Sequence, residues 1–93
     1  MSTAWKFNLE DVPGWDGDER EISRTLTFRD FVAAMSFVNK VAEVAEREQH
    51  HPDIDIRYNR VKLALTTHDA GGRVTEKDAR MAQRISELYR QAQ

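Results

Sequence analysis

The chain has 93 residues, of which 40% are hydrophobic and 32% charged, and its formal net charge is −2. This length predicts one small domain, residues 1–93, with no room for a second core. The balance of charge argues against a broad cationic surface for nucleic acid or an anionic membrane. Because the sequence contains no cysteine, disulfides, thiolate nucleophiles and cysteine-ligated metal sites are excluded.

The first residues, "MSTAWKFNLE", lack the apolar core of a signal peptide, and no run approaches about 18 apolar residues. We therefore expect a cytoplasmic protein. Residues 1–14 are expected to be irregular, because the region around Pro13 and Gly14 is rich in turn-forming and acidic residues. Apart from Trp5, Phe7 and Trp15, this segment has little to bury.

The segment "ISRTLTF", 22–28, alternates in polarity and predicts a strand with Ile22, Leu26 and Phe28 on one face. Arg24 interrupts that apolar face. In the "TFRD" that follows, Thr27 precedes Asp30 by three residues, which is the spacing of a capping box and predicts the start of a helix.

Apolar residues at helical spacing carry this helix to about Gln49, where Pro52 restricts His51 to extended conformations and should end it. We expect Phe31 and Met35 to lie in the core. The other members of the apolar stripe and its flanks are Val32, Ala34, Val38, Val41, Ala42 and Ala45.

Two alternating segments come next, 54–58 and 61–67, and only Asn59 and Arg60 separate them. This pattern predicts a hairpin with a two-residue turn. After "DAGG", the motif "TEKD" repeats the capping-box spacing from Thr75 to Asp78 and predicts a last helix. Its apolar stripe comprises Ala79, Ala82, Ile85, Leu88 and Ala92, flanked by Met81 and Tyr89.

The predicted fold class is α+β, in the order β-β-α-β-β-α, with an antiparallel four-stranded sheet and two long helices packed on one face. The other face of the sheet would be solvated or used in assembly. A domain this small buries its apolar surface inefficiently, so self-association would stabilise it.

All three histidines fall between residues 50 and 68. His50 and His51 lie at the end of the first long helix, and His68 lies at the end of the last strand, so the three would line one rim if those ends meet. Imidazole can donate or accept a proton near neutrality. Glu46 precedes His50 by four residues on the same helical face and is expected to orient it.

Structural explanations stay open for the same residues. A histidine at a helix C-terminus interacts favourably with the helix dipole, and His68 could simply cap a strand. Asp78 has the place of the acidic partner in a capping box, and Thr66 and Thr67 are ordinary strand residues. Trp15 could be a core anchor.

A three-histidine zinc site is a competing chemistry. Adjacent side chains at a helix end point about 100° apart, which makes a shared ion awkward for His50 and His51. The sequence also lacks an HxxxH spacing. We therefore expect no metal.

The motifs "AEREQHHPDIDIRYNRV" and "TTHDAGGRVTEKD" together resemble the pterin-4a-carbinolamine dehydratase family, and the similarity extends from about Trp15 to Leu88. The resemblance implies a four-stranded antiparallel sheet with helices on one face, in a homodimer or homotetramer. It implies dehydration of 4a-hydroxytetrahydropterin to quinonoid dihydropterin without a metal or organic cofactor. That reaction recycles the cofactor of aromatic amino acid hydroxylases, such as phenylalanine hydroxylase.

The resemblance also implies roles for single residues. His50 and His68 match the acid/base candidates, His51 matches a histidine associated with pterin binding, and Asp78 matches an acidic residue that assists the site. The family positions beside the pterin, or close to it, correspond to Trp15, Glu46, Thr66 and Thr67.

Two alternatives follow from the same resemblance. Animal members also act as a dimerisation cofactor for a homeodomain transcription factor, although the three histidines argue against a purely non-catalytic module. Other pterins, including folate- or molybdopterin-related compounds, would also suit this chemistry. Longer members begin with an N-terminal helix, whereas we expect the fourteen residues before Trp15 to be irregular, and the "GGRVTEKD" loop is one residue longer than the common form.

Overall fold

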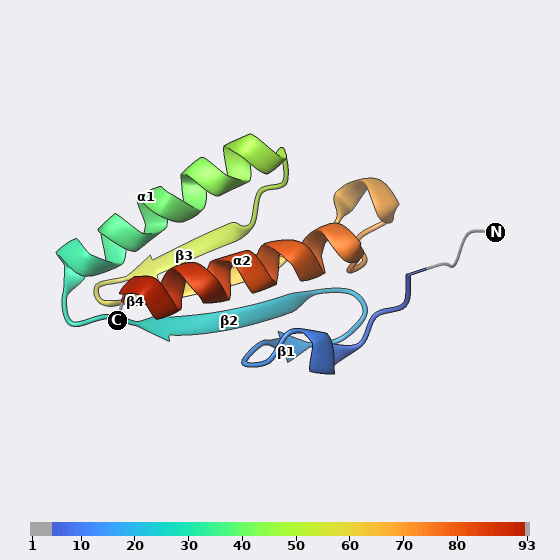
Figure 1. Ribbon diagram of the computed structural model, residues 1–93, viewed down its shortest axis with the longest axis horizontal. Coiled ribbons are helices and arrows are strands. Elements are labelled where there is room, and N and C mark those ends of the chain that lie inside the picture. Colours follow the sequence, from blue (N-terminus) through green and yellow to red (C-terminus); the bar gives the residue numbers. More distant parts are fainter. Residues whose placement is uncertain (1–4, 93) are drawn as a thin grey trace.

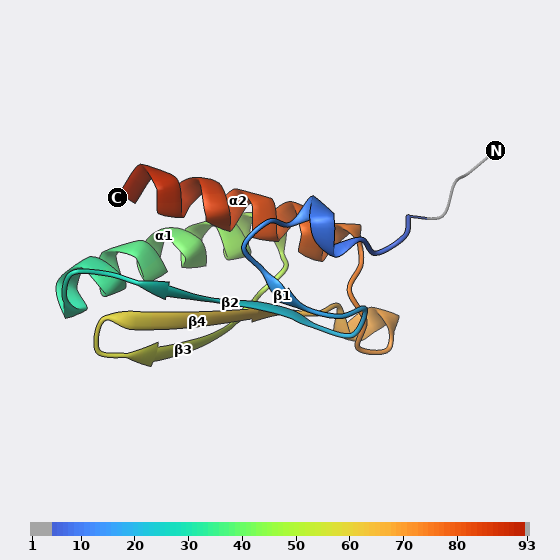
Figure 2. The ribbon, with the colours of Figure 1, turned by 90° about the horizontal axis from the view of Figure 1, so that it is seen from below.

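The computed structural model describes residues 5–92 and confirms the predicted α+β class. A four-stranded antiparallel sheet has the strand order β1-β2-β4-β3. Both long helices lie on the same side of this sheet, as Figure 2 shows edge-on. The elements in Figure 1 are η1 (Leu9–Asp11), β1 (Asp16–Gly17), β2 (Ile22–Thr27), α1 (Phe31–Glu48), β3 (Asp53–Arg57), β4 (Arg60–Leu65), η2 (His68–Ala70) and α2 (Glu76–Ala92).

Strand β2 has the predicted alternation, with Ile22 and Leu26 buried beneath the helices, and Phe28, which directly follows the strand, is buried as well. Arg24, which interrupts the apolar face, is accommodated at its border. Its guanidinium donates a hydrogen bond to Ser86 Oγ at 2.9 Å and lies 5.4 Å from the ring centroid of Tyr89. The cation is therefore paired with an acceptor and an aromatic ring rather than isolated in the core.

Helix α1 begins later than predicted, and the expected capping box from Thr27 to Asp30 is wrong. Asp30 is itself the N-cap, and its Oδ1 accepts a hydrogen bond from the backbone N–H of Ala33 at 2.8 Å. The reason lies in Phe28, whose N–H donates to the carbonyl of Asn59 at 2.8 Å and keeps the chain extended past Thr27.

The buried stripe of α1 is rotated from the predicted one. Phe31 was expected in the core, but 47% of its surface is exposed, and Val32 is 75% exposed. Figure 1 shows that the first turn of α1 reaches past the β3–β4 hairpin, so no strand lies beneath it. Met35 is only half-buried and Ala42 is exposed, whereas the buried residues are Ala34, Phe37, Val38, Val41, Val44 and Ala45.

The hairpin turn is formed by Tyr58 and Asn59, one residue earlier than predicted, because Arg60 already pairs with Arg57. Tyr58 takes a left-handed conformation with φ 54°. Asn59 fixes this turn against the end of β2, since its side-chain amide donates to the carbonyl of Phe28 at 2.8 Å. Strand β4 also ends earlier than predicted, at Leu65.

The helix start predicted from the second capping-box spacing is confirmed, with one of the two hydrogen bonds of that motif. Helix α2 begins at Glu76, and the N–H of Thr75 donates to Asp78 Oδ2 at 2.8 Å. Ala79, Ala82 and Ile85 are buried as expected, whereas Ala92 in the last turn is exposed.

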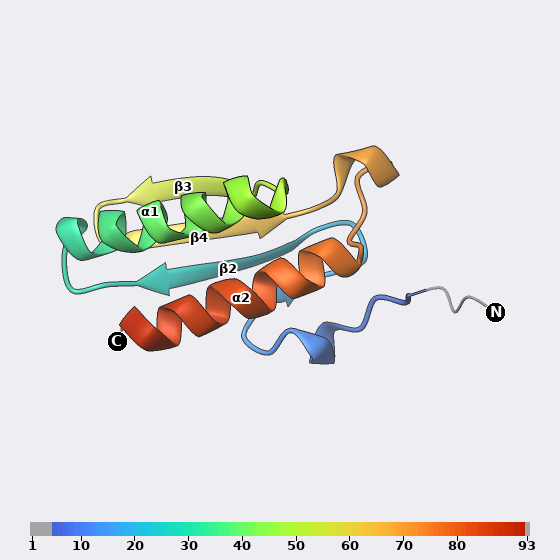
Figure 3. The same ribbon diagram turned by 45° about the horizontal axis from the view of Figure 1, so that its top comes forward.

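The N-terminal segment is irregular except for η1, as far as residues 5–14 are concerned; residues 1–4 of the predicted irregular region lie outside the described part. Trp15 and Val12 are each only 3% exposed and belong to the core, and Trp5 and Phe7 pack against it while partly buried. This segment runs beside α2 in Figure 3.

Candidate active site

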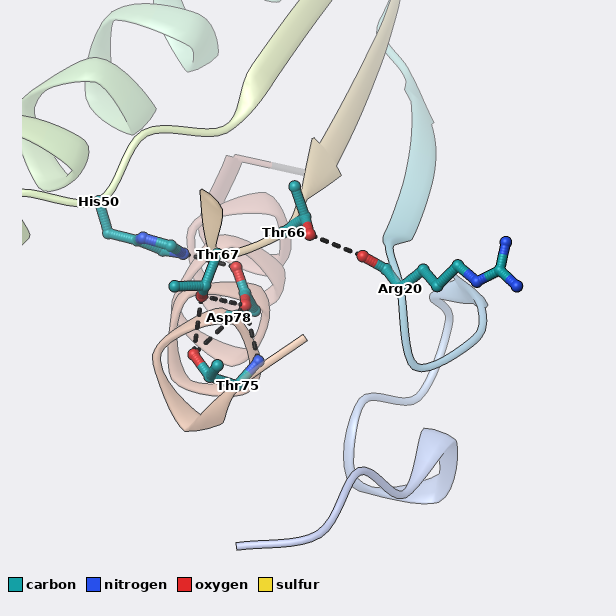
Figure 4. Close-up of polar contacts among 6 residues, drawn as sticks. All are labelled: Arg20, His50, Thr66, Thr67, Thr75 and Asp78. Atoms are coloured by element: carbon teal, nitrogen blue, oxygen red, sulfur yellow. Dashed lines mark hydrogen bonds and ion pairs between the residues drawn. The ribbon is translucent and has the colours of Figure 1, made fainter. Parts of the chain in front are cut away.

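A buried carboxylate, that of Asp78, lies at the centre of the candidate site and has no exposed surface. Its Oδ1 lies 2.5 Å from Nε2 of His50, and its Oδ2 accepts hydrogen bonds from the hydroxyl of Thr67 at 2.6 Å and the N–H of Thr75 at 2.8 Å. Figure 4 shows these groups converging on the carboxylate. Both oxygens of a buried anion are thus supplied with donors, which offsets its desolvation.

The partners of Asp78 come from three separate elements. His50 follows the end of α1, Thr67 follows the end of β4, and Thr75 directly precedes α2. In Figure 1 the end of α1 and the start of α2 lie at the same end of the molecule. The sequence prediction that a helix end meets a strand end is confirmed for His50 and the segment before His68.

The direction of His50 is set by the way in which α1 ends. Gln49 takes a left-handed conformation with φ 54°, and the N–H of His50 donates to the carbonyl of Ala45 at 3.1 Å. This is the geometry with which helices commonly terminate. It turns the chain away from the helix axis and aims the imidazole at α2.

The predicted pairing of Glu46 with His50 is wrong. Glu46 Oε2 instead lies 2.6 Å from Nε2 of His51, and both side chains are largely exposed. The spacing rule for helical faces holds only while the helix continues, and here it ends at Glu48.

The hydrogen bond to Asp78 selects one tautomer of His50. With Nε2 facing the carboxylate, the hydrogen lies on Nε2 and leaves Nδ1 as the nitrogen free to exchange a proton. The His50 side chain is 12% exposed, so the ring is held rather than solvated. The pair has the form of a carboxylate that positions an acid/base imidazole.

The other predicted residues have different surroundings. His68 is exposed at the start of η2, immediately after Thr67. The hydroxyl of Thr66 donates to the carbonyl of Arg20 at 2.6 Å, which ties the end of β4 to the loop before β2 (Figure 4). Trp15 is buried in the core, and its Nε1–H donates to Ser86 Oγ at 3.0 Å. The structure therefore brings His50, Asp78 and Thr67 into one network, and it places Trp15 in the packing of the domain.

A groove between α1 and α2 was missed by the sequence analysis. It encloses about 380 Å³, and His50 forms part of its wall. The signal was present in α2, where Lys77, Arg80 and Arg84 recur at helical spacing. A fourth cationic side chain in the groove, that of Arg47, comes from α1. Its proximity to the other three could be seen only in the structure.

Two further findings concern residues 5–92. Within them, no group of three or more His, Cys, Asp or Glu side chains is placed to hold a metal ion. No helix in this part of the chain is long and apolar enough to cross a membrane.

Comparison with known proteins matches residues 2–88 to the family model described as pterin 4 alpha carbinolamine dehydratase. A relative from Acidobacterium capsulatum, named "Putative pterin-4-alpha-carbinolamine dehydratase", is 61% identical over 85 residues, covering 91% of each chain. A relative of the same name from Thermomicrobium roseum is 54% identical over 80 residues, covering 86% of this chain and 85% of that one.

Solved structures agree with these matches. A crystal structure of a transcriptional coactivator/pterin dehydratase from Brucella melitensis has a TM-score of 0.81 and 36% identity, covering 87% of each chain. A pterin dehydratase-like protein described as a RuBisCO assembly factor in the alpha-carboxysome shares the fold, with a TM-score of 0.66 and 18% identity over 94% of this chain and 90% of that one. With a family model that covers most of its length and relatives above half identity, this chain belongs to the pterin-4-alpha-carbinolamine dehydratase family.

Proposed function

We propose that this protein eliminates water from a 4a-hydroxytetrahydropterin to give the quinonoid dihydropterin, with His50 and His68 as the acid/base pair. The observation that carries the proposal is the His50 imidazole, which is held against the buried carboxylate of Asp78 at 2.5 Å. Membership of the dehydratase family supports the same chemistry.

The reaction needs one proton delivered and one removed. The C4a–O bond breaks as the hydroxyl leaves, and an acid that protonates this oxygen releases it as water. The N5–H proton passes to a base, and its electron pair forms the C4a=N5 double bond. One imidazole acting as acid and another as base supply both transfers, and such catalysis typically contributes about 10²–10⁴-fold.

Asp78 acts in this scheme through His50. Its carboxylate keeps the hydrogen of His50 on Nε2, so that Nδ1 is the nitrogen that exchanges a proton with the pterin. It also lies beside the ring whenever the ring carries a second proton, where a negative charge is favourable. Thr67 and Thr75 hold the carboxylate in this position through their hydrogen bonds to Oδ2.

His51 and Glu46 have a binding role in the proposal. Their side chains are paired and exposed beside His50, where they can meet the polar edge of a pterin ring. The exposed His68 follows Thr67 directly, so it lies next in the chain to a residue that contacts Asp78.

The proposed product is a recycled form of the cofactor that aromatic amino acid hydroxylases consume, and phenylalanine hydroxylase is the proposed functional partner. We also propose that the chain forms a homodimer or homotetramer, because 93 residues bury little apolar surface by themselves.

Stopped-flow absorbance tests the proposal directly. The carbinolamine is generated in the instrument, and its dehydration is followed with wild type, His50→Ala and His68→Ala, each with and without chelator pretreatment. Wild type is expected to accelerate the reaction, each variant is expected to lose at least tenfold of that acceleration, and the chelator is expected to have no effect.

Asp69→Asn is the matched control for His68→Ala, because Asp69 is the exposed neighbour of His68 in η2. It is expected to retain the wild-type rate. Absence of acceleration by folded wild-type protein, or full activity of both histidine variants, would overturn the proposal.

A further inference from the structure

The groove between the two helices carries an unusual concentration of positive charge. Four cationic side chains line it, and Glu48 is the one acidic side chain among the lining residues. The chain as a whole has a net charge of −2, so this charge is local to the groove. The cations are Arg47, Lys77, Arg80 and Arg84.

Most of this charge is not neutralised by the protein. Among residues 5–92, no carboxylate lies within 4.0 Å of the cationic groups of Arg47, Lys77 or Arg84. Arg80 has only a long contact with Glu76, 3.9 Å from Nη1 to Oε2. Exposed pairs of this kind contribute little, so the cations remain available to a ligand.

The cations line the same groove as His50 and come from both helices. Lys77, Arg80 and Arg84 follow one face of α2 and span about 10 Å of its axis. Arg47 faces them from the last turn of α1, and His50 closes part of the same wall. Val44 and Met81 supply apolar surface, which is suited to a chain of carbon atoms between a ring and an anionic end.

We propose that this groove is an anion subsite that binds a phosphate ester on the side chain of the pterin substrate. The inference rests on the proposed function, because it takes the pterin ring to be bound at His50. A phosphate ester carries about −1.5 to −2 charges at pH 7 and three acceptor oxygens. Arginine matches this geometry with paired N–H donors, and two arginines on facing helices can hold one phosphate from both sides.

The test compares two dihydropterins that have the same ring and side chain, one with a terminal phosphate monoester and one without. Their Kd values are measured by calorimetry at about 20 mM and about 150 mM ionic strength, because screening weakens exposed charge interactions over this range. Wild type is expected to bind the phosphorylated ligand at least tenfold more tightly at low salt. That preference is expected to shrink at the higher salt.

The variant Arg47→Gln/Arg84→Gln removes one cation from each wall and is expected to reduce the preference to less than twofold. Arg57→Gln/Arg60→Gln makes the same change of charge on the β3–β4 hairpin, outside the groove, and is expected to keep the preference. Equal Kd values in wild type, or a preference that survives Arg47→Gln/Arg84→Gln, would overturn the inference.

Inorganic phosphate distinguishes a free anion from a side-chain phosphate. If it occupies the groove as tightly as the phosphorylated pterin does, the groove binds a separate anion and the inference fails. Stopped-flow dehydration of the unphosphorylated carbinolamine separates this inference from the proposed function. Catalysis without a phosphate preference refutes only the subsite, whereas a groove-dependent preference without dehydration of either carbinolamine refutes only the dehydratase function.

Discussion

The Asp78 carboxylate contacts His50, Thr67 and the start of α2 at the same time. It is buried, yet each oxygen has a donor, and no buried side-chain polar atom among residues 5–92 lacks a partner. A capping residue alone would need only its contact with the N–H of Thr75. The additional contact with His50 shows that the same side chain serves both the helix start and the imidazole.

Replacing Asp78 by asparagine is expected to lower kcat for carbinolamine dehydration at least tenfold while the protein stays folded. The amide has nearly the same shape, but its NH₂ group must face either the Nε2–H of His50 or the donors at Oδ2, so the ring loses its fixed tautomer. Kinetics together with circular dichroism check this. Asp55→Asn, an exposed carboxylate in β3, is the control, and its kcat should match wild type.

Thr67→Val is expected to lower the free energy of unfolding by about 1–3 kcal/mol, because Oδ2 of the buried Asp78 loses a donor with no water to replace it. Urea unfolding measures the change. Thr25→Val, on an exposed strand position, should stay within about 0.5 kcal/mol of wild type. A similar loss in both variants would mean that the hydrogen bond is not the cause.

The position of His50 at a helix end and the family resemblance of Thr67 and Asp78 identified the residues of this site better than their partners. His50, Thr67 and Asp78 were all predicted, and they meet. The predicted pairing of Glu46 with His50 was wrong because it assumed that the helix continues to His50. The helix ends instead with Gln49 in a left-handed conformation, which usually requires a glycine and so could not be predicted from the sequence.

At the scale of elements, the type and order of helices and strands were predictable, and their ends were less so. Alternation identified β2 and the hairpin, and the Thr75–Asp78 spacing located the start of α2. The start of α1 was misplaced because Phe28 keeps a strand-like hydrogen bond to Asn59, a contact between residues far apart in the sequence. Neither propensity nor spacing contains that information.

Asp30→Ala is expected to destabilise the protein by about 1 kcal/mol, since the Ala33 N–H at the start of α1 loses its side-chain acceptor. Thermal unfolding should show a fall in Tm of about 4–8 °C for a domain of this size. Glu43→Ala, at an exposed position within α1, removes a charge of the same sign without touching a cap and should leave Tm nearly unchanged. If both variants fall equally, charge rather than capping is responsible.

At the scale of the whole molecule, the N-terminal segment is joined to the sheet and to α2 through one hydroxyl. Ser86 Oγ accepts hydrogen bonds from Trp15 Nε1 at 3.0 Å and from Arg24 Nη1 at 2.9 Å. The resemblance suggested Trp15 as an aromatic near the pterin. The structure shows it buried in the core with its N–H already paired, as the alternative interpretation of Trp15 as a core anchor predicts.

Ser86→Ala is expected to lower the free energy of unfolding by about 1–3 kcal/mol, because the buried Trp15 N–H and the Arg24 guanidinium lose their common acceptor. Denaturant unfolding followed by tryptophan fluorescence measures this loss. Ser36→Ala, at an exposed position of α1, is the control and should be neutral or slightly stabilising. A neutral Ser86→Ala would show that water replaces the hydroxyl.

The burial of the Asp78 carboxylate, which contacts His50, Thr67 and Thr75, also affects the exchange of a hydrogen with water. The hydrogen on Nε2 of His50 points at an oxygen without solvent-exposed surface, so its exchange with water requires the hydrogen bond to Asp78 to open. Its exchange rate therefore reports how often the segment after α1 loses this contact with α2. The proton NMR resonance of this one hydrogen would therefore report local opening of the domain without any added label.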